Sequence, residues 1–297
     1  MSVYAVERIR QVLDSLASDA VKPLIYAHEE IQTIEQLMRD DYSRAAYQRE
    51  LVFMALYLVV GEKAHLFADN FTEIEWEKAL QQAKQALHNN SLPQLATYFS
   101  ATSWELPYLY ATTFILQAFQ YGSITVRPGD IVIDCGARFG EAAIWAVNQG
   151  AQAVYAFEPH PKAFAFLQQN AQRFGQGKIH PINMLPAELH TEVIFTVDDA
   201  SIAVPVVPLD DWCKKQGIAP NYIKLYQDGN LVQAIEGAQH IVQQYRPRLS
   251  LCLSFTTTDI WRAPALVHSY CPEYSFACRK NTVMGDFMLY ASAEPLP

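Results

Sequence analysis

Residues 129–161 read GDIVIDCGARFGEAAIWAVNQGAQAVYAFEPHP, and this order of residue types predicts a strand, a glycine turn, a helix and a second strand. The β-branched run at 131–133 is typical of a strand buried on both faces of a parallel sheet, and 153–157 follows the same pattern. Between them, apolar residues within about 141–149 predict a helix that packs on the sheet. Gly150 then stands where a left-handed helix cap is favoured. The segment predicts a doubly wound α/β fold.

Acidic residues and glycines follow these two strands. Asp134 ends the first strand, and Gly136 and Gly140 bracket the turn that leads into the helix. A turn without Cβ atoms lets the backbone approach a ligand, and the positive end of the helix favours an anionic or carboxylate group there. Glu158 ends the second strand, about 20 residues beyond the turn, where such a fold places the carboxylate that binds both ribose hydroxyls. Together they predict half of a nucleotide-cofactor site.

The glycine spacing discriminates between classes of cofactor. A dinucleotide-binding turn has the pattern G-x-G-x-x-G, in which the second glycine admits a pyrophosphate. This chain instead has D-x-G-x-x-x-G at residues 134–140. A nicotinamide or flavin oxidoreductase is therefore the least favoured function. The sequence also lacks a Ser-His-Asp arrangement or a phosphate loop that would indicate a hydrolase or a kinase.

Further motifs continue this pattern along the chain. They are DCGARFG at 134–140, YAFEP at 155–159, VPLDD at 207–211, IKLYQDG at 223–229 and Gly237-Ala238. On these motifs, the segment from about residue 125 to the C-terminus resembles the FkbM family of class I S-adenosylmethionine-dependent methyltransferases. Members of that family carry DxGAxxG, YAFEP, V-x-LDD and IKxDxEG in the same order. Several motifs in order are more specific than one glycine turn.

The resemblance implies a mostly parallel, Rossmann-like sheet with a closing antiparallel hairpin, and transfer of a methyl group to a hydroxyl on a sugar or secondary metabolite. S-adenosylmethionine is then the cofactor. Because its sulfonium already activates the methyl group, the protein needs in-line positioning and a modest base. The residues expected to bind the cofactor are Asp134, Gly136, Ala137, Arg138, Gly140, Glu158, Pro159 and Asn183.

Two positions depart from the family pattern. Arg138 replaces the usual asparagine of the turn; it can pair with the methionine carboxylate of the cofactor, or it can be a solvated loop residue. Tyr226 replaces the aspartate of the IKxD motif, and a phenol stays protonated at neutral pH. Asp228 is therefore the candidate for orienting the acceptor, and it forms the candidate catalytic set with Tyr226 and Lys224. Lys224 is expected to meet the acceptor or a carboxylate, or to extend to solvent.

These departures leave two functions open. The first is an active O-methyltransferase; the second is a protein of the same fold that has lost catalysis and serves as a binding or regulatory partner. The retained Asp134, Gly136, Gly140 and Glu158 favour cofactor binding in either case. His160 offers a similar choice, because it can reach an acceptor hydroxyl or cap the next helix.

The remaining residues divide the chain into three predicted parts. Residues 1–95 have helical spacing and predict a small helical domain, residues 96–124 an aromatic-rich linker helix or lid, and residues 125–297 the methyltransferase domain. The wholly apolar run at 51–60 indicates the central helix of a bundle or a subunit interface, and hence a possible homodimer through the N-terminal helices. Within the last part we expect a helix at 161–174, strands at 178–182, 222–226 and 248–255, an inserted hairpin at 191–207, a helix at 231–245 and closing strands at 274–280 and 285–291. Asp210 and Asp211 are expected to cap a helix from Trp212.

Composition narrows the partners. The 297 residues carry a formal net charge of −9 and no Lys/Arg-rich run, which disfavours a nucleic acid. Five cysteines have no C-x-x-C pair or zinc spacing, so reduced buried thiols and no metal are expected. The chain shows no apolar signal core, and its longest apolar run is about half a bilayer span. We therefore expect a cytoplasmic protein without a membrane partner, acting on a small-molecule or glycan acceptor.

Overall fold

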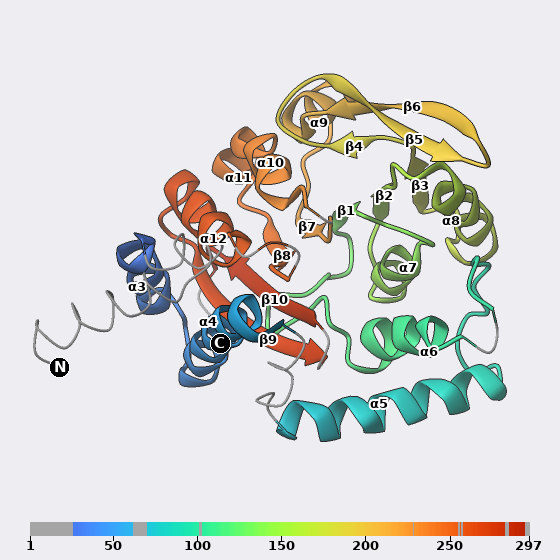
Figure 1. Cartoon of the computed structure of the whole chain (residues 1–297). Coiled ribbons are helices and arrows are strands. Elements are labelled where there is room, and N and C mark those ends of the chain that lie inside the picture. The colour runs from blue at the N-terminus through green and yellow to red at the C-terminus, as the bar shows by residue number, and fades with distance from the viewer. Residues whose placement is uncertain are drawn as a thin grey trace, which may run out of the picture.

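The computed structural model describes residues 26–61, 70–100, 103–227, 229–254, 256, 258–282 and 285–294. Its centre is a seven-stranded sheet in the order β3-β2-β1-β7-β8-β10-β9 (Figure 1). Strands β3, β2, β1, β7 and β8 pair in parallel, and β10 runs antiparallel to both β8 and β9. The strands are β1 (Ile131–Cys135), β2 (Ala153–Phe157), β3 (Ile179–Ile182), β7 (Tyr222–Leu225), β8 (Arg248–Cys252), β9 (Ser275–Thr282) and β10 (Gly285–Ser292). The predicted mostly parallel Rossmann-like sheet with a closing hairpin is confirmed.

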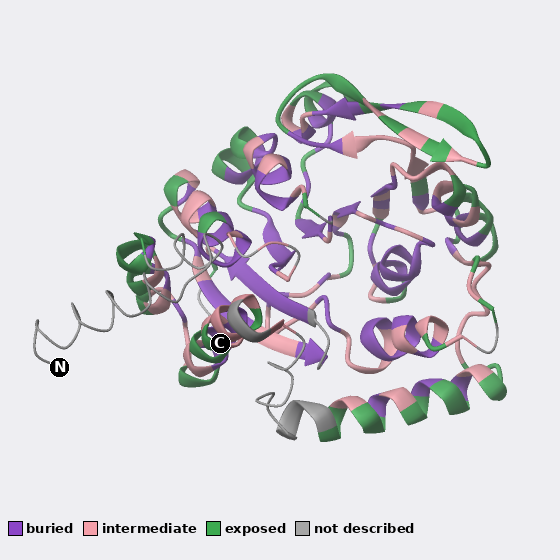
Figure 2. Ribbon diagram, in the orientation of Figure 1, coloured by how far each residue is buried: buried purple, intermediate pink, exposed green. Residues whose placement is uncertain are grey.

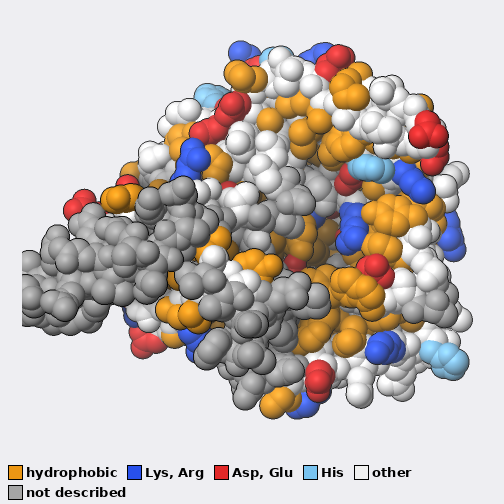
Figure 3. Space-filling model, viewed as in Figure 1, with side chains coloured by type: hydrophobic (Ala, Val, Ile, Leu, Met, Phe, Trp, Pro, Cys, Tyr) orange, Lys and Arg blue, Asp and Glu red, His pale blue; other side chains and the backbone are white. Residues whose placement is uncertain are grey.

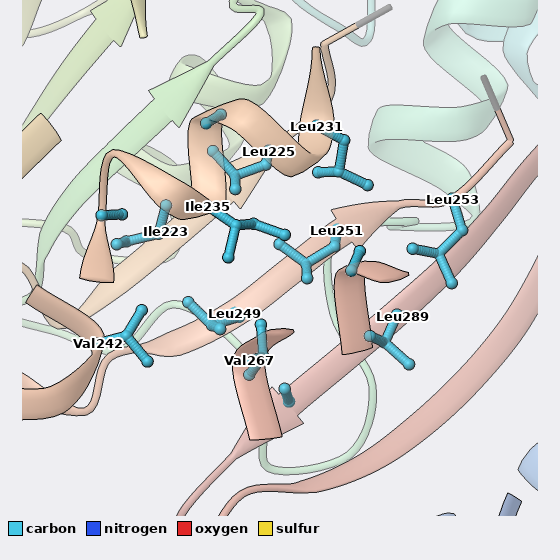
Figure 4. Close-up of a cluster of buried hydrophobic side chains, with 14 of the residues drawn as sticks. Ile223, Leu225, Leu231, Ile235, Val242, Leu249, Leu251, Leu253, Val267 and Leu289 are labelled. Atoms are coloured by element: carbon cyan, nitrogen blue, oxygen red, sulfur yellow. The ribbon is translucent and has the colours of Figure 1, made fainter. Parts of the chain in front are cut away.

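Side chains alternate across the sheet and divide the core into two layers. On β7, Ile223 and Leu225 face one layer, together with Leu249 and Leu251 of β8 (Figure 4). This layer is covered by α9 (Leu209–Gln216), α10 (Leu231–Glu236), α11 (Gln239–Tyr245) and α12 (Asp259–Tyr270). Because the strand period is two, Tyr222 and Lys224 face the opposite layer. The central strands of the sheet are largely buried, whereas exposed residues lie on the outer faces of the helices and on the two-stranded hairpin at the top of the view (Figure 2).

The opposite layer contains α7 (Glu141–Asn148) and α8 (Pro161–Phe174). Helix α7 is buried almost throughout because its residues are small or apolar, with Ala142, Ala143 and Trp145 among them. Gly150 has φ +99°, as expected for a left-handed residue after a helix. Thus the segment quoted from the sequence forms the predicted strand, turn, helix and strand.

Two predictions about helices are wrong. The helix expected at 231–245 is two helices, α10 and α11, that part at Gly237-Ala238. A Cβ on Gly237 would lie 2.0 Å from the carbonyl oxygen of Ala187, so a neighbouring segment passes directly beside the break. The helix expected from Trp212 begins at Leu209, and its N-cap has no side-chain hydrogen bond. Asp210 instead accepts hydrogen bonds from the backbone N–H groups of His240 and Ile241, at 2.8 and 2.9 Å, in the first turn of α11.

The inserted hairpin has the predicted bounds, with β5 (Thr191–Val197) antiparallel to β6 (Ala200–Val207). A short strand that the sequence did not suggest, β4 (Leu185–Pro186), pairs with β6 and completes a separate three-stranded sheet. Figure 1 shows this sheet at the top of the molecule, beyond the ends of β2 and β3.

The described N-terminal helices pack on the large sheet or on helices next to it. They are α3 (His28–Gln36), α4 (Asp41–Val60) and α5 (Asn70–His88). Met38 and Tyr47 share one buried cluster with Phe276 and Leu289. Asp40 caps the N-terminus of α4, because its carboxylate accepts a hydrogen bond from the Ser43 N–H at 2.6 Å. Among the described helices, none combines the length and apolar character needed to cross a bilayer.

The aromatic segment runs between α5 and β1. It forms α6 (Glu105–Tyr110), which continues as a π-helix, η2 (Ala111–Ile115). Their buried residues include Leu109, Tyr110 and Ala111, which cluster with Ala79 and Ala83 of α5. The segment therefore packs against α5 and leads from it to the first strand of the sheet. Single π-helical turns are rare and are frequently found at functional sites. The position of η2 therefore makes the neighbouring end of the sheet a candidate for the site.

Candidate functional site

Strand order reverses between β1 and β7. From β1 the chain continues to β2 and β3 on one side, whereas β7 leads to β8 on the other. In doubly wound folds this reversal opens a crevice at the carboxyl ends of the strands. Asp134 at the end of β1 and Lys224 on β7 share the face that carries α7. In space-filling view, the region over β1, β2 and α7 is hollowed and bordered by hydrophobic and basic side chains (Figure 3).

The left-handed backbone of the β1–α7 turn favours its two glycines, and close packing against backbone also requires the first of them. Gly136 has φ +73°, and a Cβ there would lie 1.9 Å from the carbonyl oxygen of Tyr226. Gly140 has φ +86°, and its Cβ would lie 2.8 Å from Cδ1 of Leu167. The sequence led us to expect that the missing Cβ atoms make room for a ligand. In the structure they let the turn pack against the end of β7 and against α8, and this packing fixes the entry of α7.

A buried ion pair joins the two central strands. The Lys224 ammonium donates hydrogen bonds to Asp134 Oδ1 at 2.7 Å and to the Gly136 carbonyl oxygen at 2.9 Å. Both side chains are at most 5% exposed. Of the three orientations expected for Lys224, the structure shows the one in which it meets a carboxylate. The ammonium also lies 5.1 Å from the ring centroid of Phe119 and 5.4 Å from that of Tyr226.

Glu158 is held by the backbone. Its Oε2 accepts from the Arg138 N–H and its Oε1 from the His160 N–H, both at 2.8 Å. Burial raises the pKa of Glu158 to about 7, and the two backbone hydrogen bonds oppose that rise. A carboxylate has about four lone-pair sites, so each oxygen keeps one for a further donor. The Glu158 carboxylate is thus oriented in advance and still able to accept hydroxyl hydrogen bonds.

Residues beside Glu158 fix its surroundings. The Asn183 amide donates to the carbonyl oxygens of Glu158 and Pro159, at 2.8 and 3.0 Å. Ala137 is buried, and its N–H donates to the Phe157 carbonyl oxygen at 2.9 Å. His160 is the N-cap of α8, where Nδ1 accepts a long hydrogen bond of 3.5 Å from the Ala163 N–H. This is the helix-capping alternative expected for His160.

Arg138 occupies a left-handed position of the turn, with φ +50°. Asparagine tolerates this conformation better than most residues, which gives a physical reason for the asparagine usual at this position in the family pattern. The Arg138 guanidinium lies over the rings of Phe99 and Phe139, 4.7 and 5.2 Å from their centroids. It is half-buried at the rim of the crevice rather than extended into solvent.

A small cavity of about 50 Å³ lies at this crevice. One wall is the β1–α7 turn and the end of β7; the other is the aromatic segment. Residues of the aromatic segment thus line the cavity, and its predicted role as a lid stays a prediction. The residues that line the cavity are Tyr108, Leu109, Thr112, Thr113, Phe119, Gly136, Arg138, Glu141, Lys224 and Tyr226.

Behind this cavity lies a carboxylate that the sequence did not reveal. The phenols of Tyr226 and Tyr108 both donate hydrogen bonds to Asp286, one to each carboxylate oxygen. Asp286 is 2% exposed and stands at the start of β10. Burial raises its pKa, and hydrogen bonds from Tyr108, Tyr226 and Thr282 oppose the rise. The predicted Asp228 lies outside the described residues.

Glu141 is a second acidic group that sequence reasoning missed. It lines the cavity and is 7% exposed, and burial raises its pKa while Arg138 and Lys224 oppose the rise. Its place in the first turn of α7 was a visible signal, because an acidic residue is favoured at a helix N-terminus. For Asp286, the only indication in the sequence was its position at the start of the last predicted strand. That strand, β10, runs antiparallel to β8, so it begins at the edge of the sheet where β1 and β7 end.

Comparison with known proteins places these features in context. No family model matches the chain. It is 36% identical over 83 residues to 31-O-demethyl-FK506 methyltransferase FkbM from Streptomyces tacrolimicus, a match that covers 28% of this chain and 32% of that protein. The chain therefore spans about a third of the curated relative that it matches.

Solved structures give a broader likeness. The methyltransferase FkbM from Methylobacillus flagellatus KT superposes with a TM-score of 0.64 at 19% identity, over 92% of this chain and 61% of that one. A precorrin-6y C5,15-methyltransferase from Geobacter metallireducens GS-15 gives a TM-score of 0.40 at 15% identity, over 67% and 92% of the two chains. Because the sequence identity is only 19%, the likeness to the Methylobacillus flagellatus structure shows a shared fold and no more.

Proposed function

We propose, on the premise that this chain is of FkbM type in its sequence motifs and fold, that it is an S-adenosylmethionine-dependent methyltransferase that methylates a hydroxyl on a sugar or secondary metabolite. The observation that carries the proposal is Glu158. Its carboxylate is held by two backbone N–H groups at the switch point of the sheet, and each oxygen keeps a lone pair for a ribose hydroxyl.

Other residues of the site fit the same cofactor. Asp134 Oδ2 is buried without a hydrogen-bond partner among the described residues. A buried carboxylate oxygen normally accepts a hydrogen bond, so this atom can accept one from a bound ligand. The Arg138 guanidinium at the cavity rim matches a carboxylate in geometry and charge. Asn183 fixes the backbone that follows β2, next to the position expected for the adenine of the cofactor. When bound, the cofactor supplies a methyl group already activated by its sulfonium.

The chain's own contribution is positioning and exclusion of water. Phe119, Tyr108 and Leu109 enclose the cavity, and an enclosed site strengthens the polar contacts made within it. The alternative, a binding protein that has lost catalysis, rests on the departures at Tyr226 and Arg138. Asp286 weakens the first of these two grounds, because a carboxylate does lie at the site, bonded to the phenol of Tyr226.

Calorimetric titration tests the proposal directly. S-adenosylmethionine and S-adenosylhomocysteine are expected to bind with micromolar affinity, and NAD is expected not to bind. Glu158→Ala should weaken binding by about 1.5–3 kcal/mol, the scale of a hydrogen bond to a charged group, without lowering the melting temperature of the ligand-free protein. Equal affinity of the wild type and this variant would contradict the assignment of Glu158.

Partners are a further part of the proposal. The acceptor is a small molecule or a glycan, and a second copy of the chain is proposed to dock on the N-terminal helices. Val52 supports this, because it is 60% exposed in the apolar second half of helix α4. Light scattering should give a mass of two chains for the wild type and of one for Val52→Asp. A wild-type mass of one chain would overturn the dimer.

A further inference from the structure

Glu141 places a buried carboxylate at the cavity, in the first turn of α7. The side chain lines the cavity and is 7% exposed. Its Oε2 accepts a hydrogen bond from the Phe139 N–H at 3.2 Å, whereas its Oε1 has no hydrogen-bond partner among the described residues. Buried polar atoms are almost always hydrogen-bonded, and a buried charge needs a partner. The free oxygen of Glu141 therefore leaves a place for a donor.

The nearby cations of the protein do not fill this place. Arg138 and Lys224 line the same cavity, and their charges oppose the rise in the pKa of Glu141 that burial causes. Of the described ion pairs, none joins either residue to Glu141. The Lys224 ammonium instead donates to Asp134 and to the Gly136 carbonyl oxygen, and the Arg138 guanidinium lies over two phenylalanine rings. The carboxylate is thus left for a cation from outside the chain.

Two further acceptors line the cavity. Thr113 of η2 is 1% exposed, and its hydroxyl makes no hydrogen bond within the described part of the chain. The Gly136 carbonyl oxygen accepts from Lys224 and keeps a second lone pair. With Glu141 Oε1, these atoms match the three hydrogens of an ammonium group. The volume of about 50 Å³ is sufficient for such a group, since roughly 10–15 Å³ holds one water.

We infer that Glu141, together with Thr113 and the Gly136 carbonyl oxygen, binds the α-ammonium group at the methionine end of the cofactor, while Arg138 binds the carboxylate of the same end. This inference rests on the proposed methyltransferase function and adds cofactor-binding residues to it. It also reverses an expectation from the sequence. The N-terminus of α7 was expected to attract an anionic group of the ligand, but a carboxylate of the chain itself lies there, so the cavity accepts a zwitterion.

This arrangement predicts how the site ranks ligands. A ligand without the amino group leaves Glu141 Oε1 buried and unpaired, and an unpaired buried charge is costly. A ligand without the carboxylate leaves Arg138 without its partner at the rim. Arg138 is half-buried there and stays partly solvated, so this second loss should be the smaller one.

The test is calorimetric titration of the full-length protein with three ligands. They are S-adenosylhomocysteine, its deaminated derivative, which keeps the carboxylate, and its decarboxylated derivative, which keeps the ammonium. The wild type should bind S-adenosylhomocysteine at least tenfold more tightly than the deaminated derivative. Glu141→Gln should weaken S-adenosylhomocysteine and the decarboxylated derivative tenfold or more, and the deaminated derivative less than twofold. Glutamine has nearly the same size, but it carries no charge to pair with the ammonium.

Three variants accompany this comparison. Arg138→Gln should give the crossed pattern, in which the deaminated derivative is weakened and the decarboxylated one is not. Thr113→Val should weaken both ammonium ligands about threefold, the scale of one neutral hydrogen bond. Glu50→Gln is the matched control, because Glu50 is 4% exposed and pairs with Lys280 away from the cavity. It should change no affinity more than twofold. A general loosening of the fold would weaken all three ligands together and cannot give the crossed pattern.

Every other result contradicts a stated part. If the wild type fails to bind S-adenosylhomocysteine, the proposed function itself fails. If the wild type binds S-adenosylhomocysteine and the deaminated derivative equally, the ammonium site is wrong while cofactor binding stands. If Glu141→Gln weakens all three ligands alike, or none, Glu141 does not bind the ammonium. Should Glu141→Gln fail to fold, the wild-type comparison and Thr113→Val decide the question.

Discussion

The ammonium of Lys224 lies 2.7 Å from Oδ1 of Asp134, and both groups are almost wholly buried between β1 and β7. This pair connects the strand that leads into the glycine turn with the strand that ends at the cavity. Its third partner, the Gly136 carbonyl oxygen, extends the connection to the turn itself. The cavity wall formed by the β1–α7 turn and the end of β7 is therefore held together by one lysine.

Removing that lysine should be costly. Lys224→Met leaves the Asp134 carboxylate buried without its partner, and breaking a buried pair in this way costs about 3–5 kcal/mol of unfolding free energy. Chemical denaturation measures this value. Arg246→Met is the control, because the Arg246–Glu273 pair is about half exposed and should contribute at most about 1 kcal/mol. Equal losses in the two variants would show that Lys224 does not hold the strands together.

Gly136 should not tolerate a side chain. In Gly136→Ala the new Cβ would meet the Tyr226 carbonyl oxygen at 1.9 Å, so β7 and the turn must separate. Gly177→Ala is a matched control, since Gly177 has the same φ of +73° with nothing within 4 Å of its Cβ position. The control should cost about 1–2 kcal/mol for its left-handed backbone alone. Thermal melting should show a clearly larger loss for Gly136→Ala; similar losses would mean that the close approach is unimportant.

Much of the fold was predictable because its strands are local patterns. Residues 153–157 and the hairpin at 191–207 have the predicted bounds, since β-branched or aromatic runs end at turn residues there. Helix α12 was missed, and Pro264 within it argues against a helix when only the sequence is read. The break between α10 and α11 depends on the backbone of Ala187, which is distant in the sequence, so no local pattern announces it.

The site divides in the same way. Asp134, the glycine turn and Glu158 belong to one continuous segment, and their arrangement follows from the strand–turn–helix unit. Asp286 belongs to the last strand, and Tyr108 to a helix that precedes the sheet. They meet Tyr226 through tertiary packing, which a single sequence does not disclose. The departure at Tyr226 was visible, but the carboxylate bonded to it was not.

Arg138 should discriminate between ligands with and without a carboxylate. If its guanidinium binds the methionine carboxylate, Arg138→Gln should weaken binding of S-adenosylhomocysteine by about 1.5–3 kcal/mol. Binding of 5′-methylthioadenosine, which has no carboxylate, should be unchanged. Arg173→Gln is the control, because Arg173 lies over Phe174, and Arg173 is not among the cavity residues. If Arg138→Gln binds both ligands as the wild type does, Arg138 is only a loop residue packed on Phe99.

Glu158 should make ligand binding depend on pH near neutrality. Burial raises the pKa of Glu158 in the folded protein to about 7, above its ordinary value of 4.5. From pH 4.5 to about 7 the native state therefore holds a proton that the unfolded state has lost, so the contribution of Glu158 to stability falls as pH rises through this window. Ribose hydroxyls donate best to the ionised carboxylate, so affinity should rise as that proton leaves.

The measurement is calorimetric titration with 5′-methylthioadenosine, which carries the ribose without the titrating amino acid of the cofactor. Affinity should increase about tenfold between pH 6 and 8, as expected for one group with a pKa of about 7. Glu158→Gln should bind more weakly at pH 8 and lose the slope. Glu141 and Lys224 also act on the Glu158 carboxylate, and Glu141 is itself buried with a raised pKa. Glu141→Gln is therefore the needed comparison: a slope that vanishes in this variant and persists in Glu158→Gln would assign the titration to Glu141.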